Sequence, residues 1–214
     1  MATVEVIQAL QERFPELKLE ARPLVTYADG RPSDQLWVRV PPDRLLDVLQ
    51  FLYRDARTKF EQLCDLTCVD YLNYPDATDR FGVIYSLLSL THNHRLWVKA
   101  FVNDPEPELP TVTSIWQGAN WPEREVYDMF GVTFRGHPDL RRILMWETYA
   151  EGYPLRKDFP LRGHFSRAEQ TRQALAANPE AHYSLEELSI AEAFGDLPED
   201  MRQRLKEGHR GELR

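Results

Sequence analysis

Apolar residues in the first quarter of the chain recur with the spacing of helices. Val6 or Ile7, Leu10 and Phe14 lie three to four residues apart, which predicts one helix that ends before Pro15. A second stripe of leucine and valine between residues 45 and 52 predicts another helix. This helix opens at a pair of prolines, where missing backbone donors cost nothing.

Between and after these helices, apolar residues alternate with polar ones, as they do in strands with one buried face. No helical stretch joins the strands of a pair, and a turn at 91–94 joins the last two as a hairpin. This order predicts an α+β domain with an α-β-β-α-β-β-β core, whose mixed or antiparallel sheet is covered by two helices. The expected strands cover residues 24–27, 36–40, 62–71, 81–90 and 96–102.

The pattern changes after residue 103, which divides the chain into three expected regions. Residues 1–103 form the core domain, and 104–145 form a proline-rich linker and a dense segment that packs on the core and on a partner. Residues 146–214 have too little apolar surface to fold alone, so we expect an extended arm that partner subunits order. Its short helical patches cover residues 168–177, 184–194 and 198–207.

The 214-residue chain carries a formal net charge of −8, with 26 basic and 34 acidic side chains. An acidic chain lacks the basic surface that phosphate backbones require, so no nucleic-acid partner is expected. Residues 135–172 depart from the average, since they hold eight basic and five acidic side chains. This basic segment is either a docking surface for an acidic partner or is compensated by the chain's own carboxylates.

The two cysteines, Cys64 and Cys68, are too few for a four-cysteine iron–sulfur or zinc site. Both fall in a strand pattern, so we expect them to be reduced and buried in the core. The first residues lack the pattern of a signal peptide, and no apolar run reaches the length of a membrane span. Membrane association is therefore expected only through another subunit.

Residues 121–145, here called the signature segment, concentrate charge, aromatic side chains and turn residues. Such a segment is either an active site or a surface that fits one neighbour. Glu125 and Asp128 lie three apart on the expected helix and share a face, while Glu123 is expected to point elsewhere. With His137, this carboxylate pair would suit a divalent metal or general-base chemistry.

Arginines interleave with these carboxylates. Arg124 lies among them, and Arg141 and Arg142 follow closely. Carboxylates beside guanidinium groups form ion pairs far more often than they act as bases, which favours a structural ion-pair network. No phosphate-binding glycine loop, nucleophile elbow or HExxH zinc motif occurs in the sequence. We therefore expect no catalytic residue, bound cofactor or metal on this chain.

Turn residues shape the second half of the signature segment. Gly131 is expected to end the helix, and residues 136–139, with the sequence GHPD, to form a polar corner. Asp139 is expected to cap a short helix at 140–144.

Residues 123–144 read ERExxDMFGVxFxGHPDLRRIL, where x marks positions without a motif residue. This run is preceded by LPTVT at 109–113 and followed by GYPLRKDFP at 152–160. Together they resemble the signature of the thirty-kilodalton subunit of proton-translocating NADH:quinone oxidoreductase (respiratory complex I). The resemblance covers roughly residues 5–162, and the family's α-β-β-α-β-β-β core agrees with the order of elements above.

The resemblance implies a non-catalytic structural subunit in the hydrophilic arm of the complex, at the cytoplasmic face of the bacterial inner membrane. It implies contact with the subunit that resembles the large subunit of hydrogenases, here called the hydrogenase-like subunit, and with neighbouring cluster-bearing subunits. FMN, iron–sulfur clusters and quinone would reside on other subunits, which pass electrons from NADH to quinone and translocate protons. The implied interface residues are Glu123, Arg124, Glu125, Asp128, Phe130, Gly131, Gly136, His137, Pro138, Asp139, Arg141 and Arg142, with Trp116, Trp121, Arg156 and Lys157 as possible anchors.

Two other interpretations stay open. An equivalent subunit of a ferredoxin-linked photosynthetic complex or of a membrane-bound hydrogenase would carry a related sequence, although the intact GHPDLRR run at 136–142 fits the respiratory version better. A free-standing enzyme that uses Glu125, Asp128 and His137 would show activity or a bound metal as an isolated monomer.

Overall fold

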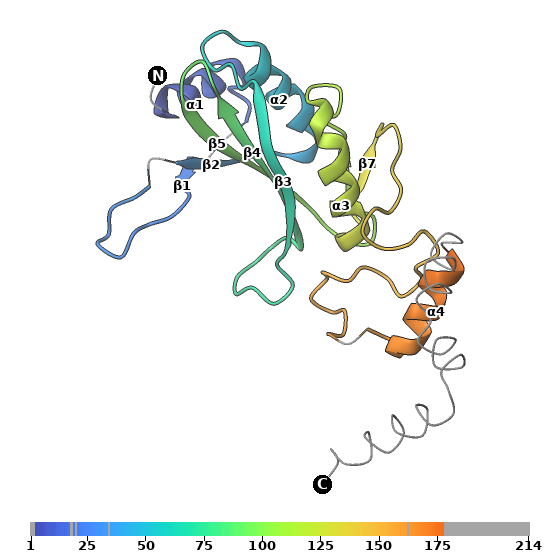
Figure 1. Cartoon of the computed structure of the whole chain (residues 1–214). Helices are drawn as coiled ribbons and strands as arrows, with labels where there is room; N and C mark the ends of the chain where they lie inside the picture. Colours follow the sequence, from blue (N-terminus) through green and yellow to red (C-terminus); the bar gives the residue numbers. More distant parts are fainter. Residues whose placement is uncertain (1–2, 18, 20, 34, 162, 178–214) are drawn as a thin grey trace, which may run out of the picture. The chain divides into compact units, whose positions relative to one another are not determined.

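The computed structural model describes residues 3–17, 19, 21–33, 35–161 and 163–177 (Figure 1). The chain divides into a first compact unit, Met1–His164, and a second unit that begins at Phe165. Residues 146–164, which the sequence assigns to the arm, thus belong to the same unit as the core. The expected helices at 184–194 and 198–207 lie outside the described residues, and the ordering of the arm by partners stays a prediction.

The first unit holds all of the described strands and all but one of the described helices (Figure 1). The second unit contributes α4, which covers the first helical patch predicted for the arm. The helices are α1 (Thr3–Arg13), α2 (Leu45–Arg54), α3 (Asn120–Phe130) and α4 (Arg167–Ala177), with short 3-10 helices η1 (Pro42–Arg44) and η2 (Gln117–Ala119). The strands are β1 (Ala21–Pro23), β2 (Leu36–Arg39), β3 (Gln62–Asp70), β4 (Phe81–Ser89), β5 (His94–Val102), β6 (Glu108–Pro110) and β7 (Thr133–Arg135).

The main sheet has five strands in the order β1-β2-β5-β4-β3. Neighbouring strands run antiparallel except β2 and β5, which are parallel, with Val38 opposite Val98. The strands β6 and β7 form a separate parallel pair. The predicted α+β fold with a mixed sheet is therefore confirmed, and the chain order α1-β1-β2-α2-β3-β4-β5 is the expected one.

One hydrophobic core joins these elements. Every second residue of β5, from His94 to Val102, is buried, while the residues between them are exposed or half-buried. Leu10 of α1 and Leu49 of α2 are fully buried and belong to this core. The same core continues into α3 through Val126, and α3 packs against the edge strand β3. The fold therefore places the signature segment at the β3 edge of the sheet (Figure 1).

Two local predictions in the sheet are wrong. The first strand covers 21–23 instead of 24–27, because residues beyond Leu24 form a hairpin loop in which Val25 and Tyr27 are 51% and 55% exposed. In β3, Leu63 pairs with β4 and the next paired residue is Asp65, so a bulge leaves Cys64 without an opposite residue. Cys64 is consequently exposed, so the prediction that it is buried in the core is wrong.

Cys68, four residues further along β3, is buried as the sequence predicts. Its burial raises the pKa of the thiol well above the ordinary range, so it stays protonated near neutral pH. Within the described residues, no helix is both long and apolar enough to cross a membrane.

Candidate functional site

The helix α3 carries the charged half of the signature segment. Val126, Met129 and Phe130 recur at helical spacing and are buried, which fixes one face of α3 against the core. Pro122 lies in the first turn, where the missing backbone donor is tolerated. The acidic residue of that turn, Glu123, also suits the positive end of the helix dipole.

Gly131 ends α3, as the sequence predicts. Its backbone is left-handed, with φ +76°, and its N–H donates to the carbonyl of Tyr127. A Cβ at this position would lie 2.4 Å from a ring carbon of Tyr153. The position therefore requires glycine both for its backbone and for the close packing of Tyr153.

Asp128 is fully buried and forms the centre of the segment. Its Oδ1 accepts a hydrogen bond of 2.7 Å from Arg142 Nη1. Its Oδ2 accepts three successive backbone N–H groups, from Ile143, Leu144 and Met145, at 3.1, 2.7 and 2.8 Å. One carboxylate thus neutralises a guanidinium and satisfies the backbone donors of a whole turn.

Arg124 fixes the other side of the same turn. Its Nε and Nη2 donate to the carbonyls of Arg141 and Arg142 at 3.0 and 2.9 Å. The carbonyls and amides that a helix at 140–144 would pair with one another are bonded to α3 instead. The prediction of that helix with Asp139 as its cap is therefore wrong.

Arg142 is held from several directions. Besides its pair with Asp128, it donates from Nη2 to the carbonyl of Gly152 at 3.1 Å. Its guanidinium carbon lies 5.4 and 5.3 Å from the ring centroids of Tyr149 and Tyr153. We call Glu123, Arg124, Asp128 and Arg142 the buried charge network.

Glu123 is fully buried. Its Oε1 accepts the N–H of Val112 at 2.7 Å, and its Oε2 accepts the hydroxyl of Thr111 at 2.6 Å. Burial raises the pKa of this carboxyl to about 7, although these two hydrogen bonds oppose the rise. Glu123 therefore ties α3 to the segment that follows β6.

His137 contacts Glu123 and not Asp128. Its Nε2 lies 3.9 Å from Glu123 Oε2 and 3.2 Å from the carbonyl of Asn120, and its side chain is buried. The backbone N–H of Asp139 donates to its Nδ1 at 3.0 Å. This pattern assigns the neutral tautomer with the proton on Nε2. His137 thus joins the start of α3 to the corner at residues 136–139.

The stretch at 152–160 is anchored on the rest of the first unit by polar contacts. Asp70, at the end of β3, accepts the backbone N–H of Lys157 at 2.8 Å. Arg156 donates from Nε to the carbonyl of Phe130 at 2.6 Å and pairs with Asp104 at 3.3 Å. These contacts satisfy the carbonyl of the last residue of α3 and explain why residues 146–164 fold with the core.

Other signature residues form an exposed layer above this network. Glu125 is exposed although Asp128, three residues later, is buried, so the predicted carboxylate pair does not exist. Arg141 is 59% exposed and pairs at the surface with Asp139 and Glu147. Trp121 and Lys157 are also exposed, as are Gly136 and Pro138, whereas Trp116 lies in the core and donates from Nε1 to the carbonyl of Glu61.

Several arginines of the basic segment at 135–172 are compensated by acids of the same chain. Arg142 pairs with Asp128, Arg156 with Asp104, and Arg135 with Glu108, and the three acids all lie outside this segment. This finding favours local compensation over an acidic partner. Among the residues that the structure describes, no group of three or more histidine, cysteine, aspartate and glutamate side chains could hold a metal ion.

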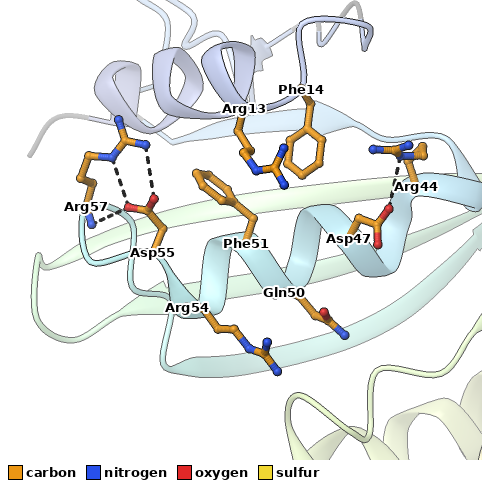
Figure 2. A pocket seen from close by; sticks show the side chains of 9 residues that line it. All are labelled: Arg13, Phe14, Arg44, Asp47, Gln50, Phe51, Arg54, Asp55 and Arg57. Carbon is orange, nitrogen blue, oxygen red and sulfur yellow. Dashed lines mark hydrogen bonds and ion pairs between the residues drawn. The ribbon is translucent and has the colours of Figure 1, made fainter.

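A second group of arginines surrounds a pocket of about 590 Å³ between α1 and α2 (Figure 2). Arg57 pairs there with Asp55 and Glu12, and Arg44 pairs with Glu16 and Asp47. The phenylalanine rings between them pack edge to face at 5.8 Å. We call this the α1–α2 pocket, which is lined by Arg13, Phe14, Arg44, Asp47, Gln50, Phe51, Arg54, Asp55 and Arg57.

Several residues that build the site could not be assigned to their partners from the sequence. Thr111, Asp70 and Asp104 hold signature residues, yet each is far from its partner in sequence. The LPTVT and GYPLRKDFP blocks mark the neighbourhoods of Thr111 and Arg156, but no periodicity identifies the acids that pair with them. Only the folded chain brings β3 beside the stretch at 152–160.

Residues 38–165 match the family model described as the respiratory-chain NADH dehydrogenase 30 Kd subunit. The chain is 50% identical over 125 residues to a subunit of the NADH-quinone oxidoreductase of Rhizobium etli, which covers 58% of this chain and 64% of that protein. It is 48% identical over 132 residues to the mitochondrial NADH dehydrogenase (ubiquinone) iron-sulfur protein 3 of Candida albicans, which covers 62% of this chain and 46% of that protein.

A solved structure is also similar. The trypsin-resistant fragment (1-134) of Nqo5 aligns with a TM-score of 0.54 and 34% identity, over 65% of this chain and all of that chain. The chain spans about half to two thirds of the length of the curated relatives described above. The match to the family model, however, covers more than half of the chain and contains the whole signature segment. The chain belongs to the 30 kDa subunit family of respiratory complex I.

Proposed function

We propose that the chain is a non-catalytic structural subunit in the peripheral arm of proton-translocating NADH:quinone oxidoreductase. In this role it docks on the hydrogenase-like subunit and on neighbouring cluster-bearing subunits, at the cytoplasmic face of the inner membrane. It reaches the membrane only through the complex. FMN, the iron–sulfur clusters and quinone are held by other subunits, which carry electrons from NADH to quinone.

The use of the charged signature residues within the fold carries this proposal. Asp128 has both carboxylate oxygens occupied by Arg142 and three backbone amides, so neither is free to take a proton from a substrate. Glu125 is exposed, and His137 faces Glu123, so the three groups of the enzyme hypothesis do not converge. A segment of this kind suits a rigid surface better than a catalytic centre.

The test of the proposal is purification of the native complex through a tag on this chain. Co-purification of flavin- and iron–sulfur-bearing subunits with NADH-dependent quinone reduction is the expected result. Co-purification of a ferredoxin-linked or hydrogenase complex would transfer the same structural role to another electron donor. Recovery of the chain alone, with activity or stoichiometric metal, would contradict the proposal.

Point variants separate docking from folding. Arg141→Ala and Glu125→Ala remove exposed signature side chains, so each should reduce the yield of assembled complex while the isolated chain unfolds at its normal denaturant concentration. Arg57→Ala is the matched control, because Arg57 is also an exposed arginine with two carboxylate partners. Normal assembly of Arg141→Ala and Glu125→Ala together with lost turnover would indicate a direct redox or proton role instead.

A further inference from the structure

The exposed layer of the signature segment borders an open groove of about 340 Å³ beside the β3 bulge. Trp121 and Leu144 are 61% and 60% exposed, and both line this groove. Single exposed apolar residues are ordinary, but a tryptophan and a leucine on one groove form a patch. Cys64, Asp65 and Glu125 line the same groove.

The buried charge network enforces the exposure of this patch. The backbone N–H of Leu144 is bonded to Asp128, and the preceding carbonyls are bonded to Arg124, so the turn cannot rotate to bury the leucine. The Arg124 guanidinium carbon also lies 5.2 Å from the Trp121 ring centroid. The groove is therefore held in one conformation, which lowers the entropic cost of filling it.

The charges at the groove are acidic. Asp65 and Glu125 are both exposed, and within the described part of the chain neither forms an ion pair. In contrast, the exposed Arg141 nearby has two carboxylate partners. An apolar floor with unpaired carboxylates is complementary to an apolar side chain that lies next to a lysine or arginine.

We propose that this groove receives a segment of the neighbouring subunit in which an apolar side chain inserts between Trp121 and Leu144 and a basic side chain pairs with Glu125 or Asp65. The proposal rests on the proposed function, because it assumes that the chain is part of the complex. The partner charge it implies is opposite to that of the acidic partner, which is one of the two alternatives that the basic segment at 135–172 left open. Arg135, Arg142 and Arg156 of that segment pair with acids elsewhere in the chain, whereas the carboxylates beside the groove form no ion pair within the described residues.

Cys64 lines the groove and provides a native probe of its occupancy. Cys64 is exposed, whereas Cys68 is buried with a raised thiol pKa, so a maleimide reacts with folded protein mainly at Cys64. The rate of Cys64 labelling is measured by mass spectrometry in the isolated full chain and in the purified complex. We expect labelling in the complex to be slower by about an order of magnitude or more, because an interface core excludes solvent. Equal rates would overturn the proposal.

Charge reversal tests the chemistry of the occupant. Glu125→Lys should lose most of the assembled complex and Glu125→Gln less, whereas Asp43→Lys, at an exposed site on η1, should assemble normally. Equal assembly of wild type, Glu125→Lys and Trp121→Ala would contradict this role of the groove. These outcomes are distinct from failure of the proposed function, in which the wild-type chain itself does not co-purify with cluster-bearing subunits.

Discussion

Two groups of arginines in this chain show how differently the same side chain can act. In the signature segment, Arg124 and Arg142 are buried or nearly so, and their donors meet carbonyls and a buried carboxylate. In the α1–α2 pocket, Arg57 and Arg44 are 49% and 36% exposed and pair with carboxylates at the surface (Figure 2). The first group defines the path of a backbone segment. The second lies at the surface, with Arg44 on η1 and Arg57 in the turn that follows α2.

The number of ion pairs that an arginine forms therefore says little about their importance for stability. Surface pairs gain little because water screens them and because two long side chains lose freedom. A buried pair is not strongly stabilising in itself, but removal of one partner leaves a charge without solvation.

Asp128→Ala should have the largest effect. It leaves the Arg142 guanidinium without its carboxylate partner and three backbone N–H groups without an acceptor, so the free energy of unfolding of the full chain should fall by about 3–5 kcal/mol. Urea denaturation measures this loss, and soluble yield reports it if the variant does not fold. The matched control is Asp55→Ala, which removes an arginine partner in the α1–α2 pocket and should cost about 1 kcal/mol or less.

Glu123→Gln should change the pH dependence of stability. The folded-state pKa of Glu123 is raised from 4.5 to about 7, so its contribution is fully present below about pH 4.5 and is lost as the pH rises through 7. The wild type should therefore lose on the order of 3 kcal/mol relative to the variant between pH 5 and pH 8. Denaturation at several pH values measures this difference, and parallel pH profiles would show that Glu123 is not buried as an acid.

The pKa of Asp55 shifts in the opposite direction, which sharpens the contrast. A hydrogen bond from Arg57 lowers the pKa of Asp55, so any stability it contributes is lost only when the pH falls through that lowered value. Asp55→Asn should therefore leave the profile between pH 5 and pH 8 unchanged. If Asp55→Asn reduced the pH dependence of the free energy of unfolding as much as Glu123→Gln does, the buried and exposed carboxylates would not differ as proposed.

Arg124→Met should have an intermediate effect. The methionine keeps an unbranched apolar chain but leaves the carbonyls of Arg141 and Arg142 without their donors, at a cost of about 1–3 kcal/mol. Hydrogen exchange should also show faster opening at Ile143 to Met145 than in the wild type. Unchanged exchange there would mean that Asp128 alone holds the turn.

Arg57→Ala should have the smallest effect, within about 1 kcal/mol of the wild type in the free energy of unfolding. Added salt should reduce even that difference, because the pairs are exposed to solvent. A loss comparable to that of Arg124→Met would contradict the view that the α1–α2 arginines are peripheral.

The sequence predicts most of the fold because each main element has an apolar face with its own period. The stripe in α2 and the alternation in β5 need no partner to be recognised, and Gly131 marks the end of α3. The errors occur where single residues depart from the period. The bulge that exposes Cys64 adds one residue to β3 without any distinctive side chain.

The candidate site is less predictable for a different reason. The sequence identifies which residues of the signature segment carry charge, but it does not identify their partners. Asp128 bonds backbone amides that look in sequence like the interior of a helix, and Thr111 reaches Glu123 across twelve positions. Such contacts follow from the packing of α3 against the turn. As a result, Glu125 and Asp128, which were expected to share one face of the helix, are one exposed and one buried carboxylate.

We propose above all that the signature segment has a buried layer that folds the chain and an exposed layer that docks it. The most direct test measures, on the same two variants, the urea midpoint of the isolated chain and the yield of assembled complex. Glu125→Ala should unfold at the wild-type midpoint and assemble poorly, whereas Asp128→Ala should unfold at much lower urea. A midpoint for Glu125→Ala as low as that of Asp128→Ala, or normal assembly of Glu125→Ala, would contradict this division.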